Sequence, residues 1–501
     1  MPDITQLSLA HNPDIFTIIC FNDGFQHALD LNAIKTLLRV CKRAQSLLSS
    51  KVPRLHSWCQ SAELCHPDRR LRIGLTPSDK IAISLHCKDQ GTTDRSWIVA
   101  LASRSNTAAW FFMARILQLD LIGPLSANMP KKGRINQRIL RHLKKAADAG
   151  HLMAQLHLAG CYNDGIVTKK DYAKAFELYQ GLAERGMAQA QVALGRCYEN
   201  GEGVDQDFDT AIDWYSKAAD QASEDGRLHI AFFRGWFSFI GRDVDQSDAD
   251  AFSHWQEVST QSINPVHKSI STHMVGWMHY LGRGTQQDKQ KGVKIIRDNE
   301  SDEFKLGETN CLSVIWSSTT SSDSLAAREF FELCRIGSDR DWLSNHLMAV
   351  CLVRGFGTMQ DRMRAAGIFE QLANEGYSDS QFWIGECFYQ GWGGPTDRKK
   401  AFEWFSKSAD QGNWFGEWMV GLCYLLGTGV TRDRSKAIEW YRKSAEQGYR
   451  YPQASLGDCY KDGWGVDADI DTAVFWYRKS ADQGYQMAIN SLIKLGQWPS
   501  P

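Results

Sequence analysis

The sequence has almost no net charge and no long apolar run. Its 57 basic residues are balanced by 58 acidic ones, which leaves a net charge of -1, so no overall field would attract nucleic acid or an anionic membrane surface. No apolar stretch approaches the roughly 18 residues of a membrane-spanning helix, and the first twenty residues contain two aspartates and no basic start. We therefore expect a cytoplasmic or nuclear protein that neither binds nucleic acid nor inserts into a membrane.

Motifs for catalysis and for metal binding are missing as well. The sequence contains no phosphate-binding glycine loop with its lysine, no Gly-x-Ser-x-Gly elbow and no His-Glu-x-x-His. It has no Cys-x-x-Cys pair, and Cys59, Cys65, His66 and Cys87 form only a loose cluster. We assign no catalytic residue, no metal site and no cofactor, and we expect the protein not to be an enzyme.

What the sequence does contain is a repeat marked by cysteine. Cys161 and Cys197 are 36 residues apart, and the same interval separates Cys351, Cys387, Cys423 and Cys459. Aligning the chain on this cysteine column gives nine copies with steps of 35 to 41 residues, and Phe237, Met278 and Ser313 fill the column in the three irregular copies. A weaker tenth copy precedes them. A period of this length is typical of an array of stacked supersecondary units.

Each unit is predicted to be a helix, a turn and an antiparallel helix. In the last copy, apolar residues recur at helical spacing on both sides of a turn that contains Gly463 and Gly465. Glycine stands at the first of these turn positions in eight of nine copies, where it can adopt the left-handed conformation that ends a helix. Alanine, fourteen residues after the cysteine column in eight of nine copies, predicts a close helix crossing. One hairpin cannot bury its own apolar face, so neighbouring hairpins must stack into a solenoid.

These letters, Ala-x-Leu-Gly-x-x-Tyr-x-x-Gly-x-Gly-Val and then Ala-x-x-Trp-x-x-Lys-Ala-Ala, resemble the Sel-one-like repeat, a relative of the tetratricopeptide repeat. The resemblance implies an all-α superhelix of about ten helix-turn-helix repeats. It also implies a scaffold that binds a protein or peptide partner, and not by itself an enzyme. The copies around Phe237, Met278 and Ser313 depart from the pattern, so we expect an irregular superhelix there.

The repeats divide the chain into four segments. We expect an F-box-like or capping helical segment at 1–55, a linker region at 56–104, the repeat solenoid at 105–485, and a C-terminal capping helix with a tail at 486–501. In the linker, alternating apolar residues between Leu71 and Leu85 predict two short strands around a turn at Thr76 to Asp79.

The thirteen cysteines are better explained by packing than by disulfides. Six of them occupy the same first-helix position, where a small buried apolar residue is expected. Secreted bacterial members of the family that this chain resembles clip each repeat with a cysteine on both helices. Here only the copy around Ser313 has two candidate cysteines, Cys311 and Cys334. The regular copies have one cysteine each and cannot form an internal disulfide, so the sequence fits a reducing compartment better than an oxidising one.

A possible binding surface follows from the first helices of the inner repeats. The positions four and one residues before the cysteine column share a helix face that we expect to be left over from packing. In the inner repeats these positions are largely apolar, and we call the following seven residues the apolar stripe: Phe233, Trp236, Met274, Trp277, Trp383, Met419 and Leu422. The stripe is either a groove for a partner helix or peptide, or additional core buried by tighter coiling.

The N-terminal segment resembles an F-box, the module that docks on the Skp adaptor of cullin ubiquitin ligases. The resemblance lies in an Asp-Leu pair at Asp30 and Leu31, in the Leu-x-Val-Cys-Lys sequence that ends at Lys42, and in the residues before them. It implies an adaptor-binding set made of Pro13, Ile15, Ile18, Leu31, Leu38 and Val40. The alternative is a helical cap for the open end of the solenoid.

Two functions stay open on the sequence alone. In the first, the protein is a substrate receptor that docks on Skp and cullin and selects a target with its repeats. In the second, it is a plain adaptor or activator in signalling or cell-wall assembly. An enzyme is a distant third possibility.

Overall fold

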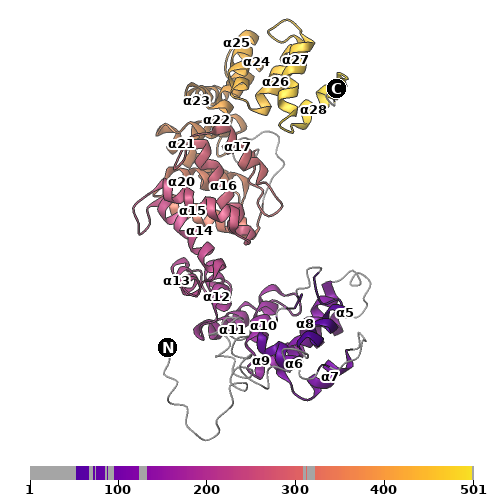
Figure 1. Ribbon diagram of the computed structural model, residues 1–501. Coiled ribbons are helices and arrows are strands. Elements are labelled where there is room, and N and C mark those ends of the chain that lie inside the picture. The colour runs from indigo at the N-terminus through magenta and orange to yellow at the C-terminus, as the bar shows by residue number, and fades with distance from the viewer. Residues whose placement is uncertain are drawn as a thin grey trace. The chain divides into compact units, whose positions relative to one another are not determined.

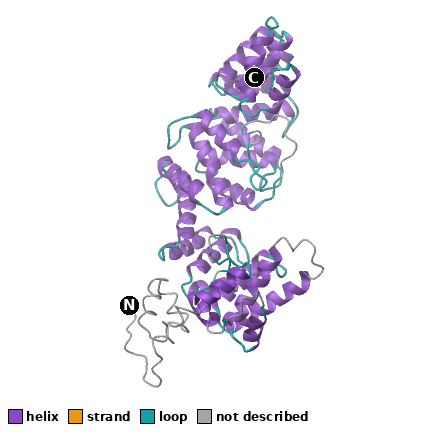
Figure 2. Cartoon of the chain, turned by 45° about the vertical axis from the view of Figure 1, so that its right-hand side comes forward, coloured by secondary structure: helices purple, strands orange, loops and turns teal. Residues whose placement is uncertain are grey.

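The computed structural model describes residues 52–66, 71–73, 75–84, 87, 95–122, 132–308, 312 and 322–498. Within these residues the chain is helical throughout, and no strand is present beyond two isolated bridges, Cys65 with Leu71 and Ser322 with Phe356 (Figure 2). The chain forms two compact units, residues 1–227 and 228–501, and the boundary falls inside one helix. Among the helices of the described residues, none has the length and hydropathy needed to cross a membrane.

The first unit contains three short helices followed by three hairpins. Its elements are α5 (Val52–Ser61), α6 (Pro77–Ser84), α7 (Ser96–Ser103), α8 (Thr107–Ile122), α9 (Lys132–Asp148), α10 (Leu152–Asp164), α11 (Tyr172–Glu184), α12 (Ala188–Asn200) and α13 (Phe208–Ala219). One continuous core runs from Leu55 to Cys197. Trp58 of α5 lies edge-on to Trp97 and to Phe112, with ring centroids 5.3 and 6.3 Å apart. The short helices are thus packed directly onto the first hairpin.

The second unit continues the hairpins to a closing helix (Figure 1). Its elements are α14 (Glu224–Ile240), α15 (Asp248–Gln261), α16 (Pro265–Leu281), α17 (Lys289–Asp298), α19 (Leu325–Gly337), α20 (Trp342–Arg354), α21 (Arg362–Asn374), α22 (Ser378–Gln390), α23 (Arg398–Asp410), α24 (Trp414–Leu426), α25 (Arg434–Glu446), α26 (Arg450–Asp462), α27 (Ile470–Ala481) and α28 (Gln486–Lys494). Successive helices pack against each other, as α26 and α27 do in Figure 1. The all-α repeat architecture predicted from the sequence is confirmed.

The turn between the two helices of a hairpin depends on both of its glycines. The first one ends the first helix in the left-handed conformation, as Gly427 does at φ 73°. The second, Gly429, also has φ 73°, and a Cβ placed on it would lie 2.0 Å from the carbonyl oxygen of Arg398, at the start of the preceding second helix. The second glycine therefore lets each turn touch the hairpin before it.

The cysteine and alanine columns are packing positions. Cys197, Cys351, Cys387, Cys423 and Cys459 are buried, and so is every member of the alanine column, including Gly292. All ten cysteines that the structure describes are free thiols. A Cβ on Gly421, two residues before Cys423, would lie 2.6 Å from the ring of Tyr441 on the paired helix. Small residues on one helix thus make room for an aromatic ring on the other.

The predicted hairpin at residues 71–85 is wrong, because residues 77–84 form α6. Thr76 and Asp79 cap this helix reciprocally: the Asp79 amide donates to the Thr76 hydroxyl at 3.2 Å, and the Thr76 amide donates to the Asp79 carboxylate at 2.9 Å. This is a capping box with proline at the first helical position. The local capping signal outweighs the alternating pattern.

Candidate functional site

The structure buries the apolar stripe within the chain itself. Phe233, Trp236, Met274, Trp277, Trp383 and Met419 are between 0 and 4% exposed, and Leu422 is half-buried. As the chain is folded here, these side chains form no open groove. This placement agrees with the core interpretation, and a role of the stripe in partner binding stays a prediction.

Two kinds of contact cover the stripe. Trp383 stacks on Phe369 of α21, with ring centroids 5.3 Å apart, so the position four residues before the cysteine column packs on the second helix of the preceding hairpin. Trp236 and Trp277, one residue before the column, face helices of later copies: Trp236 lies 6.3 Å from Phe330 of α19 and Trp277 lies 5.8 Å from His346 of α20. Neither partner follows from the pattern within one repeat.

Polar contacts show that the second unit folds back on itself. Glu308 is fully buried; it accepts one hydrogen bond from Arg297 at 2.6 Å and forms an ion pair with Arg450 of α26 at 2.8 Å. Gln290 of α17 donates to the carbonyl oxygen of Gln447 at 2.7 Å. The segment from α17 to Glu308 thus contacts the end of α25 and the start of α26, which come much later in the chain.

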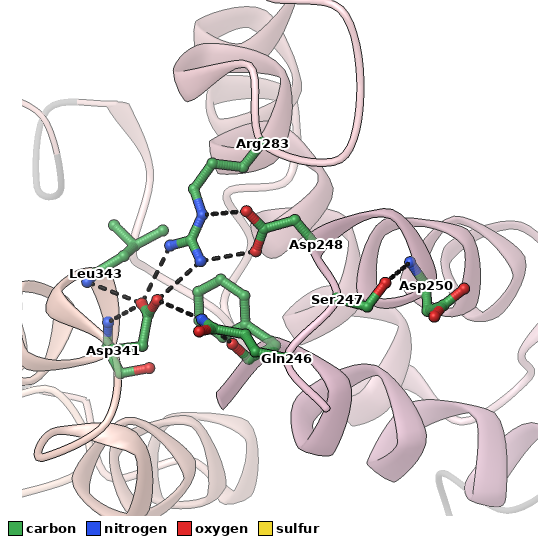
Figure 3. Close-up of polar contacts among 9 residues, drawn as sticks. Gln246, Ser247, Asp248, Asp250, Arg283, Asp341 and Leu343 are labelled. Atoms are coloured by element: carbon green, nitrogen blue, oxygen red, sulfur yellow. Dashed lines mark hydrogen bonds and ion pairs between the residues drawn. The ribbon is translucent and has the colours of Figure 1, made fainter. Parts of the chain in front are cut away.

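A second polar cluster joins the same two parts around Arg283 (Figure 3). Arg283 stands between the two turn glycines after α16, and its guanidinium donates to Asp248 of α15 at 2.7 and 2.9 Å. It also donates to Asp341 at 2.8 and 3.1 Å, and Gln246 donates to the same carboxylate at 3.3 Å. Both carboxylates raise the pKa of Arg283 against the opposing effect of burial.

Several titratable groups lie in the core of this unit. Burial lowers the pKa of His273 and of His346 to about 3, so both imidazoles are neutral near pH 7. Trp277 donates to His273 at 3.2 Å, and His346 lies 2.8 Å from the hydroxyl of Ser380. Burial raises the pKa of Glu386 to about 7. Gln390 donates to Glu386 at 3.4 Å, and Arg354 and Arg398 partly oppose the effect of burial on the pKa of Glu386.

The remaining sequence predictions fall in different places. The F-box-like set, Pro13, Ile15, Ile18, Leu31, Leu38 and Val40, lies outside the described residues. Cys59 is buried, Cys65 and Cys87 are half-buried, and His66 is exposed. Their side chains do not come together as a set of metal ligands.

The face equivalent to the stripe is open in the first unit. On α12, Gln189 and Arg196 are exposed and Ala193 between them is half-buried. On α10, His157 and Gly160 are half-buried. These positions share one side of each helix because they are spaced by three or four residues. We call residues 157, 160, 189, 193 and 196, with Arg115 and Gln118 of α8, the first-helix face.

Sequence reasoning missed two structural columns that the 36-residue interval could have revealed. An aspartate ten residues after the cysteine column caps most second helices: Asp207, Asp361, Asp397, Asp433 and Asp469 each accept a backbone N–H from the first turn. A glutamine after the second helix, such as Gln411, donates to the carbonyl oxygen of Gly376 and to Gln381 on the first helix. Both columns build the repeat, and neither marks a binding site.

Solved structures with Sel1 repeats are similar to this chain. A protective antigen of uropathogenic Escherichia coli strains, which displays an SLR fold, is 23% identical; the match covers 87% of this chain and 91% of the antigen, with a TM-score of 0.34. A Sel1 repeat protein from Oxalobacter formigenes is 21% identical, with 80% of this chain and 92% of that one covered and a TM-score of 0.29. No curated protein matches the sequence.

Eight segments of the chain match the family model of the Sel1 repeat. The Sel1 repeat matches residues 140–151, 152–187, 188–223, 269–295, 342–377, 378–413, 414–449 and 453–485. The intervals 224–268 and 296–341, which contain the cysteine-column positions Phe237 and Ser313, are not matched. Because the matched residues make up just over half of the sequence, the chain belongs to the Sel1 repeat family.

Proposed function

We propose that the protein is a non-enzymatic scaffold that binds a protein partner along the first-helix face of its first unit. Sel1 repeat proteins are in general scaffolds for protein–protein interaction. One observation supports this choice of face: Gln189 and Arg196 of α12 are exposed, whereas the equivalent side chains of α14, α16 and α22 are buried by the chain itself. A partner could reach the apolar stripe only if the second unit opened.

The composition of this face sets the kind of partner. It carries arginine, histidine, glutamine and small side chains, and large apolar groups are few. Polar faces of this kind bind through hydrogen bonds and charge complementarity, which favour specificity and rapid association over very high affinity. The partner is therefore a protein segment with polar and charged side chains.

Photo-crosslinking tests the location. A photoreactive phenylalanine analogue at Ala193 should crosslink the partner in cells, whereas the same analogue at Glu177, which is exposed on the second helix α11, should not. Equal crosslinking from both positions, or crosslinking from position 177 alone, would contradict the proposal. Glu177 is exposed and Ala193 is half-buried, so neither substitution replaces a fully buried side chain.

A finer proposal is that the chain is the substrate receptor of a Skp–cullin ubiquitin ligase. It is supported by the F-box-like residues between Pro13 and Lys42. Skp and cullin should co-purify with the protein and be lost when Ile18, Leu38 and Val40 are changed to aspartate. If neither co-purifies, the plain adaptor or activator in signalling or cell-wall assembly is the better function.

A further inference from the structure

The first-helix face contains an arginine without a counter-ion. Arg115 of α8 is half-buried, and its Nε atom is enclosed and without a hydrogen-bond partner. Among the described residues no carboxylate lies against its guanidinium. Burial lowers the pKa of Arg115; the Cys161 thiol opposes that effect, and no carboxylate does. In the second unit, by contrast, the half-buried Arg283 is paired with two carboxylates, those of Asp248 and Asp341.

The groups that do surround Arg115 are neutral. One Nη atom donates to the side-chain oxygen of Gln118 at 2.5 Å, and Gln118 in turn lies 3.7 Å from the sulfur of Cys161 on α10. His157 stands one helical turn before Cys161, and burial together with the charge of Arg115 lowers the pKa of His157 to about 4. Near pH 7, therefore, the only charge in this part of the face is that of the guanidinium.

Acidic residues on α8 and at the end of α10 have other partners. Asp120, on the same helix, forms a pair with Arg95 at 2.5 Å, with two hydrogen bonds. Asp164, at the end of α10, accepts from Asn163 at 3.3 Å. Arg196 of the same face is already paired with Asp225 at 2.8 Å. Arg115 is thus the one arginine of the first-helix face for which the described residues supply no anion.

This arrangement is unfavourable for folding alone. A charge taken partly out of water without a partner loses solvation that nothing restores. Guanidinium presents a planar fork of donors that fits a carboxylate with two parallel hydrogen bonds. The hydrogen bond that Arg115 donates to Gln118 holds this fork in place through a neutral group, so that its remaining Nη donors can meet a carboxylate from outside the chain.

We propose that Arg115, positioned by Gln118, is a binding site for a carboxylate group of the partner protein. The inference rests on the proposed scaffold function and adds the chemistry of the partner: an acidic segment, in which an aspartate or glutamate side chain or the carboxylate at a chain end contacts the guanidinium. Charge complementarity selects this occupant, since Arg115 offers the face an uncompensated positive charge beside neutral hydrogen-bonding groups.

Peptide binding to the full chain tests the site. Three pools of short, fluorescein-labelled random peptides serve as probes: the first has a central glutamate and an amidated C-terminus, the second a central glutamine and an amidated C-terminus, and the third a central glutamine and a free C-terminal carboxylate. Fluorescence anisotropy should show about tenfold tighter binding of a carboxylate pool than of the neutral pool, as a charge-assisted hydrogen bond provides. The first and third pools distinguish a side-chain carboxylate from a chain end.

Variants assign the preference to Arg115. Arg115→Met should abolish it, Arg115→Lys should retain part of it because lysine keeps the charge but not the fork, and Arg185→Met, a loss of charge at an exposed arginine after α11, should leave it intact. If the three pools bind alike, or none binds, or the preference survives Arg115→Met, the carboxylate site is refuted.

The temperature of thermal unfolding provides a test of the site that does not depend on the peptides. Without peptide, Arg115→Met should unfold at the same or a higher temperature than the original chain, because an unpaired, half-buried charge is removed. A lower unfolding temperature would show that the guanidinium serves the fold and would overturn the proposal.

The two proposals fail in different ways. Crosslinking from position 193 without a carboxylate preference would leave the scaffold function and remove the site at Arg115. A carboxylate preference that depends on Arg115, without any crosslink from position 193, would keep the site and contradict the scaffold function as placed.

Discussion

Arg283 donates two hydrogen bonds to Asp341, a residue that belongs to a hairpin two copies further along the chain and that also caps the N-terminus of α20 (Figure 3). In a simple solenoid each hairpin contacts only its neighbours. This contact skips the copy around Ser313 and brings α15, the turn after α16 and the start of α20 to one point. The second unit is therefore stabilised by long-range contacts as well as by stacking.

Removing the charge of Arg283 should destabilise this unit strongly. Arg283→Met leaves Asp341 buried without its cation, and breaking a buried pair in this way costs about 3–5 kcal/mol. Urea-induced unfolding followed by tryptophan fluorescence measures the loss. Arg328→Met is the control, because its pair with Asp323 is exposed and should contribute less than about 1 kcal/mol. Equal effects of the two variants would contradict the buried role of Arg283.

The repeated features of the fold were predictable because each one depends on local geometry. The cysteine column, the alanine column and the first turn glycine recur at a fixed interval, and each acts within one hairpin or between neighbours. The second turn glycine is required for a contact with the preceding hairpin, which the sequence suggests only through its recurrence. Such features need no knowledge of distant parts of the chain.

The role of the second turn glycine can be tested by comparing Gly429, in a crowded turn, with Gly367, inside a helix with open space around it. Gly429→Ala should cost about 2–4 kcal/mol, because alanine is strained at φ 73° and its Cβ would clash with the Arg398 carbonyl oxygen. Gly367→Ala, in the middle of α21 with open space around the added Cβ, should instead stabilise the protein by about 1 kcal/mol. Chemical denaturation of both variants checks the opposite signs, and destabilisation by both would argue against this account.

The buried cysteine column predicts slow thiol chemistry. Burial raises the pKa of Cys197, Cys387, Cys423 and Cys459 to about 12, so almost no reactive thiolate is present at pH 8. Iodoacetamide should leave these thiols unmodified in the folded protein and modify them quickly in denaturant, as peptide mass spectrometry would show. Cys65 is half-buried and serves as the internal control that reacts first. Rapid labelling of the column under native conditions would contradict the packing.

The fold-back and the fate of the apolar stripe were beyond the sequence for a physical reason. A partner groove and a core face both require apolar side chains, so the pattern of Trp236 and Trp277 is the same in either case. What decides between them is the position of α19 and α20, and the salt bridge between Glu308 and Arg450 joins residues that no repeat interval relates. Arg115 was missed because a missing counter-ion is visible only in three dimensions.

The buried histidines predict that acid weakens the second unit. The pKa of His346 is about 3 in the folded chain and near 6.5 when exposed, so the unfolded chain takes up the proton first and stability is lost as the pH falls from 6.5 toward 3. The expected slope is about 1.4 kcal/mol per pH unit for this residue. His346→Gln should remove the contribution of this residue to the slope between pH 5 and 6, which is measured by plotting the free energy of unfolding against pH. The control His66→Gln, at an exposed site, should not.

Glu386 should change the pH dependence of stability in the opposite direction to His346. Its folded pKa of about 7 lies above the ordinary value of 4.5, so the folded chain holds the proton between these values and gains stability as the pH falls through this range. Glu386→Gln removes this gain, and the acid loss between pH 7 and 4.5 should become steeper. Slopes that do not change in either variant would contradict the burial of both groups.

Trp277 provides the direct test of whether the apolar stripe is core. The side chain is fully buried, lies 5.8 Å from His346 of α20, and donates to His273. Trp277→Ala should therefore lower the free energy of unfolding by about 3–5 kcal/mol. It should also broaden the unfolding transition, because it loosens the contact between α16 and α20. Trp464→Ala, at a partly exposed turn position, is the matched control and should cost about 1 kcal/mol or less. If Trp277→Ala left stability unchanged but reduced the partner crosslink from position 193, the stripe would be a binding surface after all.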